Sequence, residues 1–236
     1  MLEQSSTGLE QFIVVVPAAG VGARMGAAIP KQYLPLQGKT VLEHTLEALL
    51  SHPQIRKVVV PLSANDGWFD DLAIAKNDNV VRTEGGKERA DSVLAGLQLC
   101  QDHNWVLVHD AARPCITHPD IDALISTALS SESGAILASQ VRDTMKRTDI
   151  HGNILTTVDR ECLWHALTPQ MFPRQLLTEA LSSGLAERKS ITDEASAMEL
   201  LGLQPKVVTG RTDNIKITRP EDMPLAELFL AQHPTK

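Results

Sequence analysis

Short apolar runs alternate along this chain with amphipathic helical patterns, and this alternation limits the fold more than any other feature. The runs occupy six segments, 12–17, 57–62, 79–83, 105–110, 134–139 and 205–210. Between them, apolar residues recur at helical spacing over 41–52, 89–100 and 120–131, and Thr40 and Glu43 have the spacing of a helix capping box. Strands that are apolar along nearly their whole length are buried on both faces. The pattern therefore predicts an α/β fold, a mostly parallel central sheet with helices on both faces.

The composition is that of an ordinary globular protein, and the length allows one large α/β domain or two small ones. Of 236 residues, 43% are hydrophobic and 22% are charged, with a formal net charge of -7. The acidic balance argues against general binding to nucleic acid or anionic membrane. The three cysteines form no CxxC pair, no Lys or Arg precedes Arg24, and the apolar runs are too short to span a bilayer. We expect one domain over residues 1–236 in the cytoplasm, with a flexible start over 1–11 and with neither nucleic acid nor a membrane as partner.

Residues 140–164 break the alternation. The segment is polar, and His151, Gly152 and Asn153 form a turn signal in its middle. This pattern is typical of a long β-hairpin rather than of another strand–helix unit. Because methionine, lysine and threonine stand where a core strand would have valine or isoleucine, we expect the hairpin to project from the body. An exposed strand edge usually finds a partner.

A glycine-rich loop follows the first apolar run. Residues 17–39 contain four glycines, Arg24 and two lysines. Bare backbone amides beside fixed positive charge suit a phosphate chain. The glycine spacing misses the dinucleotide fingerprint by one residue, no acidic residue ends the second strand, and no P-loop motif occurs. What remains is Arg24 followed by Lys31, two cations that could contact different phosphates of one nucleoside triphosphate; a solvated pair on a surface turn is the alternative.

Two clusters follow later strands. In 109–114, Asp110 could hold Mg²⁺ and Arg113 could contact an anionic substrate, because ligands of open α/β sheets bind at the carboxyl ends of strands. A helix-capping aspartate beside an exposed arginine is the alternative. Residues 84–93 form a glycine turn ahead of a helix, suited to close packing against a flat base, with Ser92 as a polar group that could read it.

The C-terminal part contributes a third cluster. Asp213 and Lys216 precede a helix that we expect Pro220 to open in its first turn. A plain strand lysine is the alternative for Lys216. Since βα loops converge at one edge of a parallel sheet, we expect all these clusters to lie together, and nearly all are basic in an acidic chain.

Six stretches together resemble the 2-C-methyl-D-erythritol 4-phosphate cytidylyltransferases of the non-mevalonate isoprenoid pathway. They run in order from about residue 12 to 230: VPAAGVGARMGAAIPKQYLPLQGKTVLEHTL, VHDAARP, VRDTMKR, WHALTPQ, ITDEAS and DNIKITRPED. The resemblance implies a Rossmann-like nucleotidyltransferase domain that uses Mg²⁺, transfers CMP from CTP to 2-C-methyl-D-erythritol 4-phosphate and releases pyrophosphate. It also implies a homodimer in which projecting hairpins interlock, here an arm over 140–160.

The resemblance assigns site residues by position. Arg24 and Lys31 would stabilise the transition state, and Arg160 and Lys216 would hold the methylerythritol phosphate. Further substrate contacts are expected at Asp110, Arg113, Thr144, Thr168 and Thr192. Nucleotide contacts are expected at Ala18, Ala19, Gly20, Gly85, Gly86 and Ser92, and metal ligands at Asp110 and Asp213. Lys87 departs from the family pattern, which has an acidic residue at this position of the GGxER turn.

Two functions of other classes compete with this interpretation. An NAD-linked dehydrogenase would need the glycine spacing and the ribose-binding acid that this sequence lacks. A catalytically silent nucleotide sensor would be expected to lack Lys31 or Lys216, and both are present.

Overall fold

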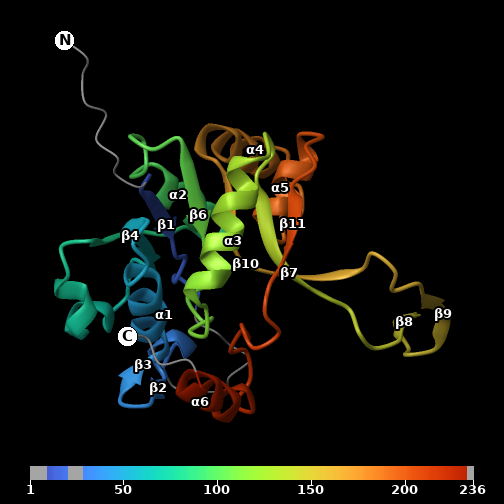
Figure 1. Cartoon of the computed structure of the whole chain (residues 1–236), viewed down its shortest axis with the longest axis horizontal. Helices are drawn as coiled ribbons and strands as arrows, with labels where there is room; N and C mark the ends of the chain where they lie inside the picture. The colour runs from blue at the N-terminus through green and yellow to red at the C-terminus, as the bar shows by residue number, and fades with distance from the viewer. Residues whose placement is uncertain (1–9, 21–28, 233–236) are drawn as a thin grey trace.

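A seven-stranded sheet in the order β11-β7-β10-β6-β1-β4-β5 forms the centre of the molecule (Figure 1). The computed structural model describes residues 10–20 and 29–232. In chain order the strands are β1 (Phe12–Val15), β4 (Ile55–Leu62), β5 (Val80–Glu84), β6 (Trp105–Val108), β7 (Ala135–Gln140), β10 (Trp164–Pro173) and β11 (Lys206–Thr209). Neighbouring strands are parallel except for β10, which is antiparallel to β6 and β7. The predicted mostly parallel sheet is confirmed.

The sequence pattern found six of these strands and missed β10. All six predicted runs form strands whose ends lie within two residues of the predicted ends. β10 reads WHALTPQMFP, in which polar residues and Pro169 interrupt the apolar pattern. Its pairing with β7 shifts register between Ala166 and Gln170, around that proline. Proline lacks the N–H that a ladder needs, so a central strand with this composition is not recognised by periodicity.

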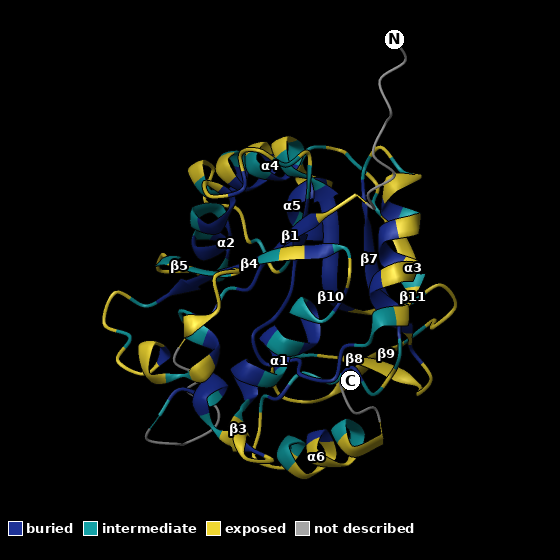
Figure 2. Ribbon diagram, turned by 60° about the vertical axis from the view of Figure 1, so that its left-hand side comes forward, coloured by how far each residue is buried: buried dark blue, intermediate teal, exposed yellow. Residues whose placement is uncertain are grey.

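Helices cover both faces of the sheet, as predicted, and the central strands between them are mostly buried (Figure 2). One face carries α1 (Val41–Leu50) and α3 (His118–Leu129), and the other carries α2 (Arg89–Leu97), α4 (Arg174–Ala186) and α5 (Glu194–Leu200). Adjacent β1 residues belong to different cores, Val14 to the first and Val15 to the second, and both are fully buried. This is why the strand sequence is apolar without alternation.

The predicted capping box at the start of α1 is confirmed. The Thr40 hydroxyl accepts the Glu43 N–H at 3.2 Å, and the Glu43 carboxylate accepts the Thr40 N–H at 2.8 Å. Helix α6 (Asp222–Gln232) starts two residues after Pro220, whose carbonyl accepts the Met223 N–H at 3.2 Å. No helix in the described part of the chain is long and apolar enough to cross a membrane.

A hairpin of β8 (Met145–Thr148) and β9 (Ile154–Val158) projects from the body as a separate two-stranded sheet (Figure 1). Gly152 has φ +85°, a conformation that glycine adopts readily. The Asp149 carboxylate accepts the N–H groups of His151 and Asn153, both at 2.9 Å, and so closes the turn. The predicted projecting arm is confirmed.

The remaining short elements lie in two connections of the chain, between β1 and α1 and between β4 and β5. Two paired strands of two residues each, β2 (Pro35–Leu36) and β3 (Lys39–Thr40), follow the 3-10 helix η2 (Lys31–Tyr33). Two more 3-10 turns, η3 (Phe69–Asp71) and η4 (Ala73–Lys76), precede β5. Helix α6 packs near β2 through Ala226, in a small core with Leu36 and Ile217.

Candidate active site

The candidate site lies where the strand order reverses. The chain runs outward from β1 through β4 and β5, then returns to the other side of β1 to form β6. The loops that leave β1 and β6 therefore diverge at their carboxyl ends, the usual ligand position in an open α/β sheet. A cavity of about 260 Å³, the first cavity, lies there. Eight predicted site residues line it: Ala18, Ala19, Gly20, Lys31, Gly86, Ser92, Asp110 and Lys216.

The start of the glycine-rich loop is fixed by hydrogen bonds. The Gln32 side chain donates to the carbonyl oxygens of Ala18 at 2.7 Å and Gly20 at 3.2 Å, and the Ala18 N–H bonds the Pro61 carbonyl at 2.8 Å. Gln32 is buried in η2, so this short helix ties the loop to the body. Arg24 lies outside the described residues.

Lys31 and Lys216 reach the first cavity from opposite ends of the chain. Lys31 Nζ donates to the Ile217 carbonyl at 2.8 Å. The Ile217 N–H in turn bonds the Ala112 carbonyl at 2.8 Å, which holds the segment before α6 against the loop after β6. The two lysines therefore add positive charge to one cavity of an acidic protein.

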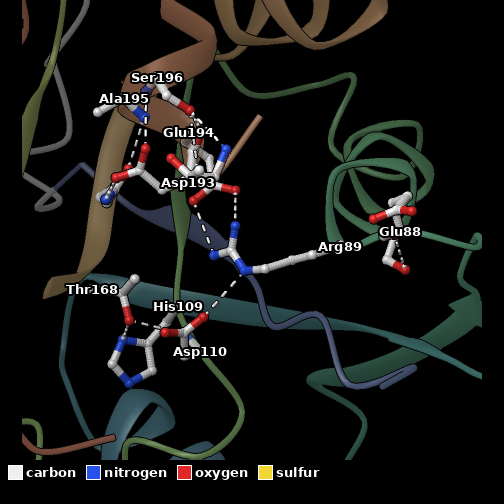
Figure 3. Close-up of polar contacts among 12 residues, drawn as sticks. Glu88, Arg89, His109, Asp110, Thr168, Asp193, Glu194, Ala195 and Ser196 are labelled. Atoms are coloured by element: carbon white, nitrogen blue, oxygen red, sulfur yellow. Dashed lines mark hydrogen bonds and ion pairs between the residues drawn. The ribbon is translucent and has the colours of Figure 1, made fainter. Parts of the chain in front are cut away.

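Asp110 is surrounded by three cations. Its Oδ1 accepts from Arg89 Nε at 3.2 Å, and its Oδ2 lies 2.9 Å from Lys216 Nζ and 3.3 Å from Arg113 Nε (Figure 3 shows the Arg89 contact). Burial alone would raise the pKa of Asp110, but the charges of Arg89, Lys216 and Arg113 outweigh it and hold this pKa well below its usual range. The carboxylate is therefore ionised and orders the cations around it.

A second cavity of about 230 Å³ adjoins the first. It is lined by predicted substrate residues Arg113, Thr168 and Thr192. Arg89, Asp110 and Lys216 line both cavities. These three residues form a charged wall between two binding spaces, an arrangement that suits the joining of two anionic substrates.

A buried histidine orients the Thr168 hydroxyl behind this wall. His109 Nε2 lies 3.0 Å from the Arg113 carbonyl, which only accepts, so Nε2 carries the hydrogen. Bare Nδ1 then accepts from Thr168 Oγ1 at 3.1 Å, and the same hydroxyl oxygen accepts the Asp110 N–H at 3.0 Å (Figure 3). The hydroxyl hydrogen is thus turned inward toward His109, so Thr168 Oγ1 can act only as an acceptor toward any further partner.

Acid should destabilise the fold through His109. Burial lowers its pKa to about 4, although the bond to the Arg113 carbonyl opposes this. In the unfolded chain a histidine has a pKa of about 6.5. The contribution of neutral His109 to the free energy of unfolding is therefore complete above about pH 6.5 and is lost as the pH falls toward 4, by about 3 kcal/mol in total. Urea unfolding at several pH values would measure this loss. In His109→Gln, the free energy of unfolding should depend less on pH in this range. An equally strong pH dependence in the variant would contradict the assignment.

The glycine turn before α2 is shaped by packing against the loop after β1. A Cβ on Gly85 would lie 2.8 Å from Ser92 Oγ and 2.9 Å from Ala19 Cβ, and one on Gly86 would lie 2.2 Å from Asp91 Cβ. Ser92 Oγ accepts the Gly86 N–H at 3.1 Å and donates to the Glu88 carbonyl at 3.2 Å. Only glycine therefore allows this turn to close over the first cavity.

Residues 12–232 match the family described as 2-C-methyl-D-erythritol 4-phosphate cytidylyltransferase (IspD). Proteins of that name from Aeromonas hydrophila and Shewanella amazonensis are 62% and 59% identical to this chain, covering 92% and 97% of it and 89% and 96% of the relatives. The chain belongs to this family. A solved family structure from Francisella tularensis, 35% identical, covers 94% of the chain and all of its own length with a TM-score of 0.80.

Two of the substrate residues that the family resemblance predicts lie apart from both cavities. Thr144 and Arg160 are exposed at the base of the projecting arm and line neither cavity in the described part of the chain. Arg160 Nη1 donates to the Arg142 carbonyl across the arm. Gly85 packs behind the first cavity against Ala19 and Ser92.

Sequence reasoning missed three residues that build this cytidylyltransferase-family site: Gln32, Arg89 and Glu194. Arg89 belongs to the quoted glycine turn and Glu194 to the quoted ITDEAS stretch. Both are charged residues at helix starts, where a solvated side chain is the ordinary expectation. Only the fold brings them together, with Arg89 Nη1 2.6 Å from Glu194 Oε1.

The two carboxylates predicted as metal ligands are already engaged. Both oxygens of Asp110 contact cations, and Arg211 donates to both oxygens of Asp213. Within the described residues, no group of three or more histidine, cysteine or acidic side chains is placed to hold a metal ion. These residues do not fit a protein-built metal cage, although Mg²⁺ commonly needs few protein ligands because substrate phosphates bind it. Their role as ligands stays a prediction.

Proposed function

We propose that this member of the cytidylyltransferase family transfers CMP from CTP to 2-C-methyl-D-erythritol 4-phosphate at the two adjoining cavities. The products are 4-diphosphocytidyl-2-C-methyl-D-erythritol, an isoprenoid precursor, and pyrophosphate. The observation that carries the proposal is the wall of Arg89, Asp110 and Lys216, which lines both cavities and places cationic groups where two anions must meet.

The first cavity would take the nucleotide. Its small residues leave backbone groups exposed to a flat base and ribose, and the predicted contacts are Ala18, Ala19, Gly20, Gly85, Gly86 and Ser92. Lys31 at its edge would meet the triphosphate, together with Arg24. Lys87 also lines this cavity and adds a further cation at the position where the family pattern has an acid.

The second cavity would take the sugar-alcohol phosphate. Asp110 and the inward-turned hydroxyl of Thr168 are hydrogen-bond acceptors, which suit the hydroxyl groups of a polyol. Arg113, Thr192 and Lys216 would complete the contacts. Thr144 and Arg160 would come from the arm of a second copy.

Catalysis in this proposal rests on position and charge. A phosphate oxygen of the acceptor attacks the α-phosphorus of CTP, the bond from that phosphorus to the pyrophosphate oxygen breaks, and pyrophosphate leaves. The acceptor phosphate is already ionised near pH 7, so the step needs no general base and no covalent intermediate. Arg24, Lys31 and Lys216 stabilise charge that grows on the transferred and leaving groups. A bound Mg²⁺ would supply further neutralisation of the triphosphate.

We further propose a homodimer formed through the arm, with no nucleic acid or membrane as partner. Ile150, Ile154 and Leu155 on the arm are 95%, 65% and 63% exposed, and apolar side chains this open on a hairpin favour a protein partner. A cytoplasmic location agrees with three free cysteines, of which Cys162 is exposed.

Pyrophosphate release with each of the four nucleoside triphosphates tests the proposal. In the presence of Mg²⁺ and 2-C-methyl-D-erythritol 4-phosphate, turnover with CTP should exceed that with ATP or GTP by roughly tenfold or more, because the narrow first cavity suits a pyrimidine. Omitting the acceptor should abolish release. Equal turnover with a purine nucleotide would overturn the assignment, and no release with any of them would favour the silent sensor.

A further inference from the structure

Glu194 is a buried carboxylate that the proposed reaction does not itself use, and it forms an ion pair with Arg89 of the wall between the cavities. Glu194 is the first residue of α5, and only 1% of its side chain is exposed. Its two oxygens accept from the two terminal nitrogens of Arg89, at 2.6 Å and 3.0 Å. A two-point bond between a guanidinium and a carboxylate fixes orientation as well as distance.

The same guanidinium contacts the wall between the cavities. Arg89 Nε donates to Asp110 Oδ1 at 3.2 Å (Figure 3). This leaves Oδ2 to face Lys216 and Arg113. Arg89 thus links Glu194, which lies outside both cavities, to Asp110, which lines both.

Both ends of this link are anchored in the body. Arg89 opens α2, where the Asp91 carboxylate accepts the Glu88 N–H at 2.9 Å. On the other side, the Ala195 N–H bonds the Gln170 side chain of β10 at 2.9 Å. The guanidinium is therefore held between two elements of one sheet face, which leaves it little freedom to turn.

The negative charge of Glu194 balances the positive charge of Arg89. Without the charge of Glu194, Arg89 would be a third cation competing for Asp110 with no anion of its own. It would draw the carboxylate toward itself and away from Lys216, or extend toward phosphates in either cavity. Glu194 satisfies the two terminal nitrogens, so that only Nε is directed at Asp110.

We propose that Glu194 and Arg89 are positioning residues, in which Glu194 holds the guanidinium so that Arg89 orients the Asp110 carboxylate and thereby sets the place of Lys216 between the two substrates. This inference rests on the proposed function, because Asp110 and Lys216 belong to the acceptor site there.

Glu194→Gln tests the inference, because it keeps the shape of the side chain and removes its charge. We expect kcat/KM for the acceptor phosphate to fall roughly 10- to 100-fold, as for a reacting group displaced by about 1 Å, with little change in KM for CTP. The same change in an Asp110→Asn background should cost less than about threefold, because the effect is transmitted through Asp110. Glu199→Gln, on the exposed side of the same helix, is the matched control and should behave as wild type.

If the effects of Glu194→Gln and Asp110→Asn on kcat/KM simply multiply in the double variant, the inference is wrong. Normal kinetics in the Glu194→Gln enzyme would also overturn it. If that variant does not fold, Arg89→Lys replaces it, since it keeps the charge and loses the two-point bond. Wild-type kinetics in Arg89→Lys would also refute the positioning role.

A crystal structure of the variant separates this inference from the proposed function. The contact between Lys216 Nζ and Asp110 Oδ2, now 2.9 Å, should lengthen or break in Glu194→Gln. An unchanged contact would overturn the inference whatever the activity. Absence of pyrophosphate release from the wild-type enzyme would instead overturn the proposed function and leave this geometric test intact.

Discussion

Replacing Lys31 by alanine should lower kcat for CMP transfer by roughly 10²- to 10³-fold, because its charge is proposed to act on the transition state rather than on the bound substrates alone. Lys31 lines the first cavity, and its Nζ is held 2.8 Å from the Ile217 carbonyl, so the charge is already in place before reaction. Arg24→Ala should show a loss of the same order. Steady-state kinetics with both substrates varied measure kcat and each KM separately.

Two controls separate catalysis by Lys31 from its effect on stability and from the loss of any surface charge. Loss of the Lys31 hydrogen bond should lower the free energy of unfolding by only about 1 kcal/mol, which urea unfolding would register. Lys39→Ala is the matched control, because Lys39 is exposed, pairs with Glu47 and lies outside both cavities. A Lys31→Ala enzyme with near-normal kcat and only a raised KM would show that the lysine binds the triphosphate without acting on the transition state.

A mixed dimer of Lys31→Ala and Arg160→Ala chains should recover about half of wild-type activity, although each variant alone is inactive. The physical reason is the arm, which projects from the body (Figure 1). It carries Thr144 and Arg160, which line neither cavity of their own chain. If a two-fold dimer combines each body with the partner's arm, one site receives both defects and the other receives none.

Co-expression with two different affinity tags yields the mixed dimer, and mass spectrometry verifies its composition. Mixing the two purified homodimers without exchange is the control and should stay inactive. An inactive mixed dimer would mean that Arg160 acts within its own chain, because each site would then keep one defect. Dimers that do not form at all would refute the arm as the interface.

Much of the fold could be predicted because local pattern and burial agree. Val14 and Val15 face different cores, and so β1 had to be apolar at both positions. Thr40 and Glu43 cap α1 through contacts three residues apart, which the sequence displays directly. The arm is recognisable for the same reason, since its polar strands and its glycine turn are local features.

The prediction failed where a strand depends on its neighbours. β10 lies between β6 and β7 and is antiparallel to both, yet its proline and polar residues give no periodic signal. Its place is decided by the strands that flank it, and it brings Thr168 beside Asp110 at 3.0 Å. Helices α4 and α5 were likewise not predicted, and α5 supplies Glu194.

The sequence by itself determined the α/β class, the six parallel strands, the arm, the family and about half of the residues that line the cavities. Local spacing, apolar continuity and long motifs carry that information along the chain. Only the tertiary structure decided that Arg89 pairs with Glu194, 105 residues away, and that Lys31 bonds a carbonyl 186 residues away. The energies of such contacts depend on burial and on distances across the sheet edge, and these exist only once the chain has folded.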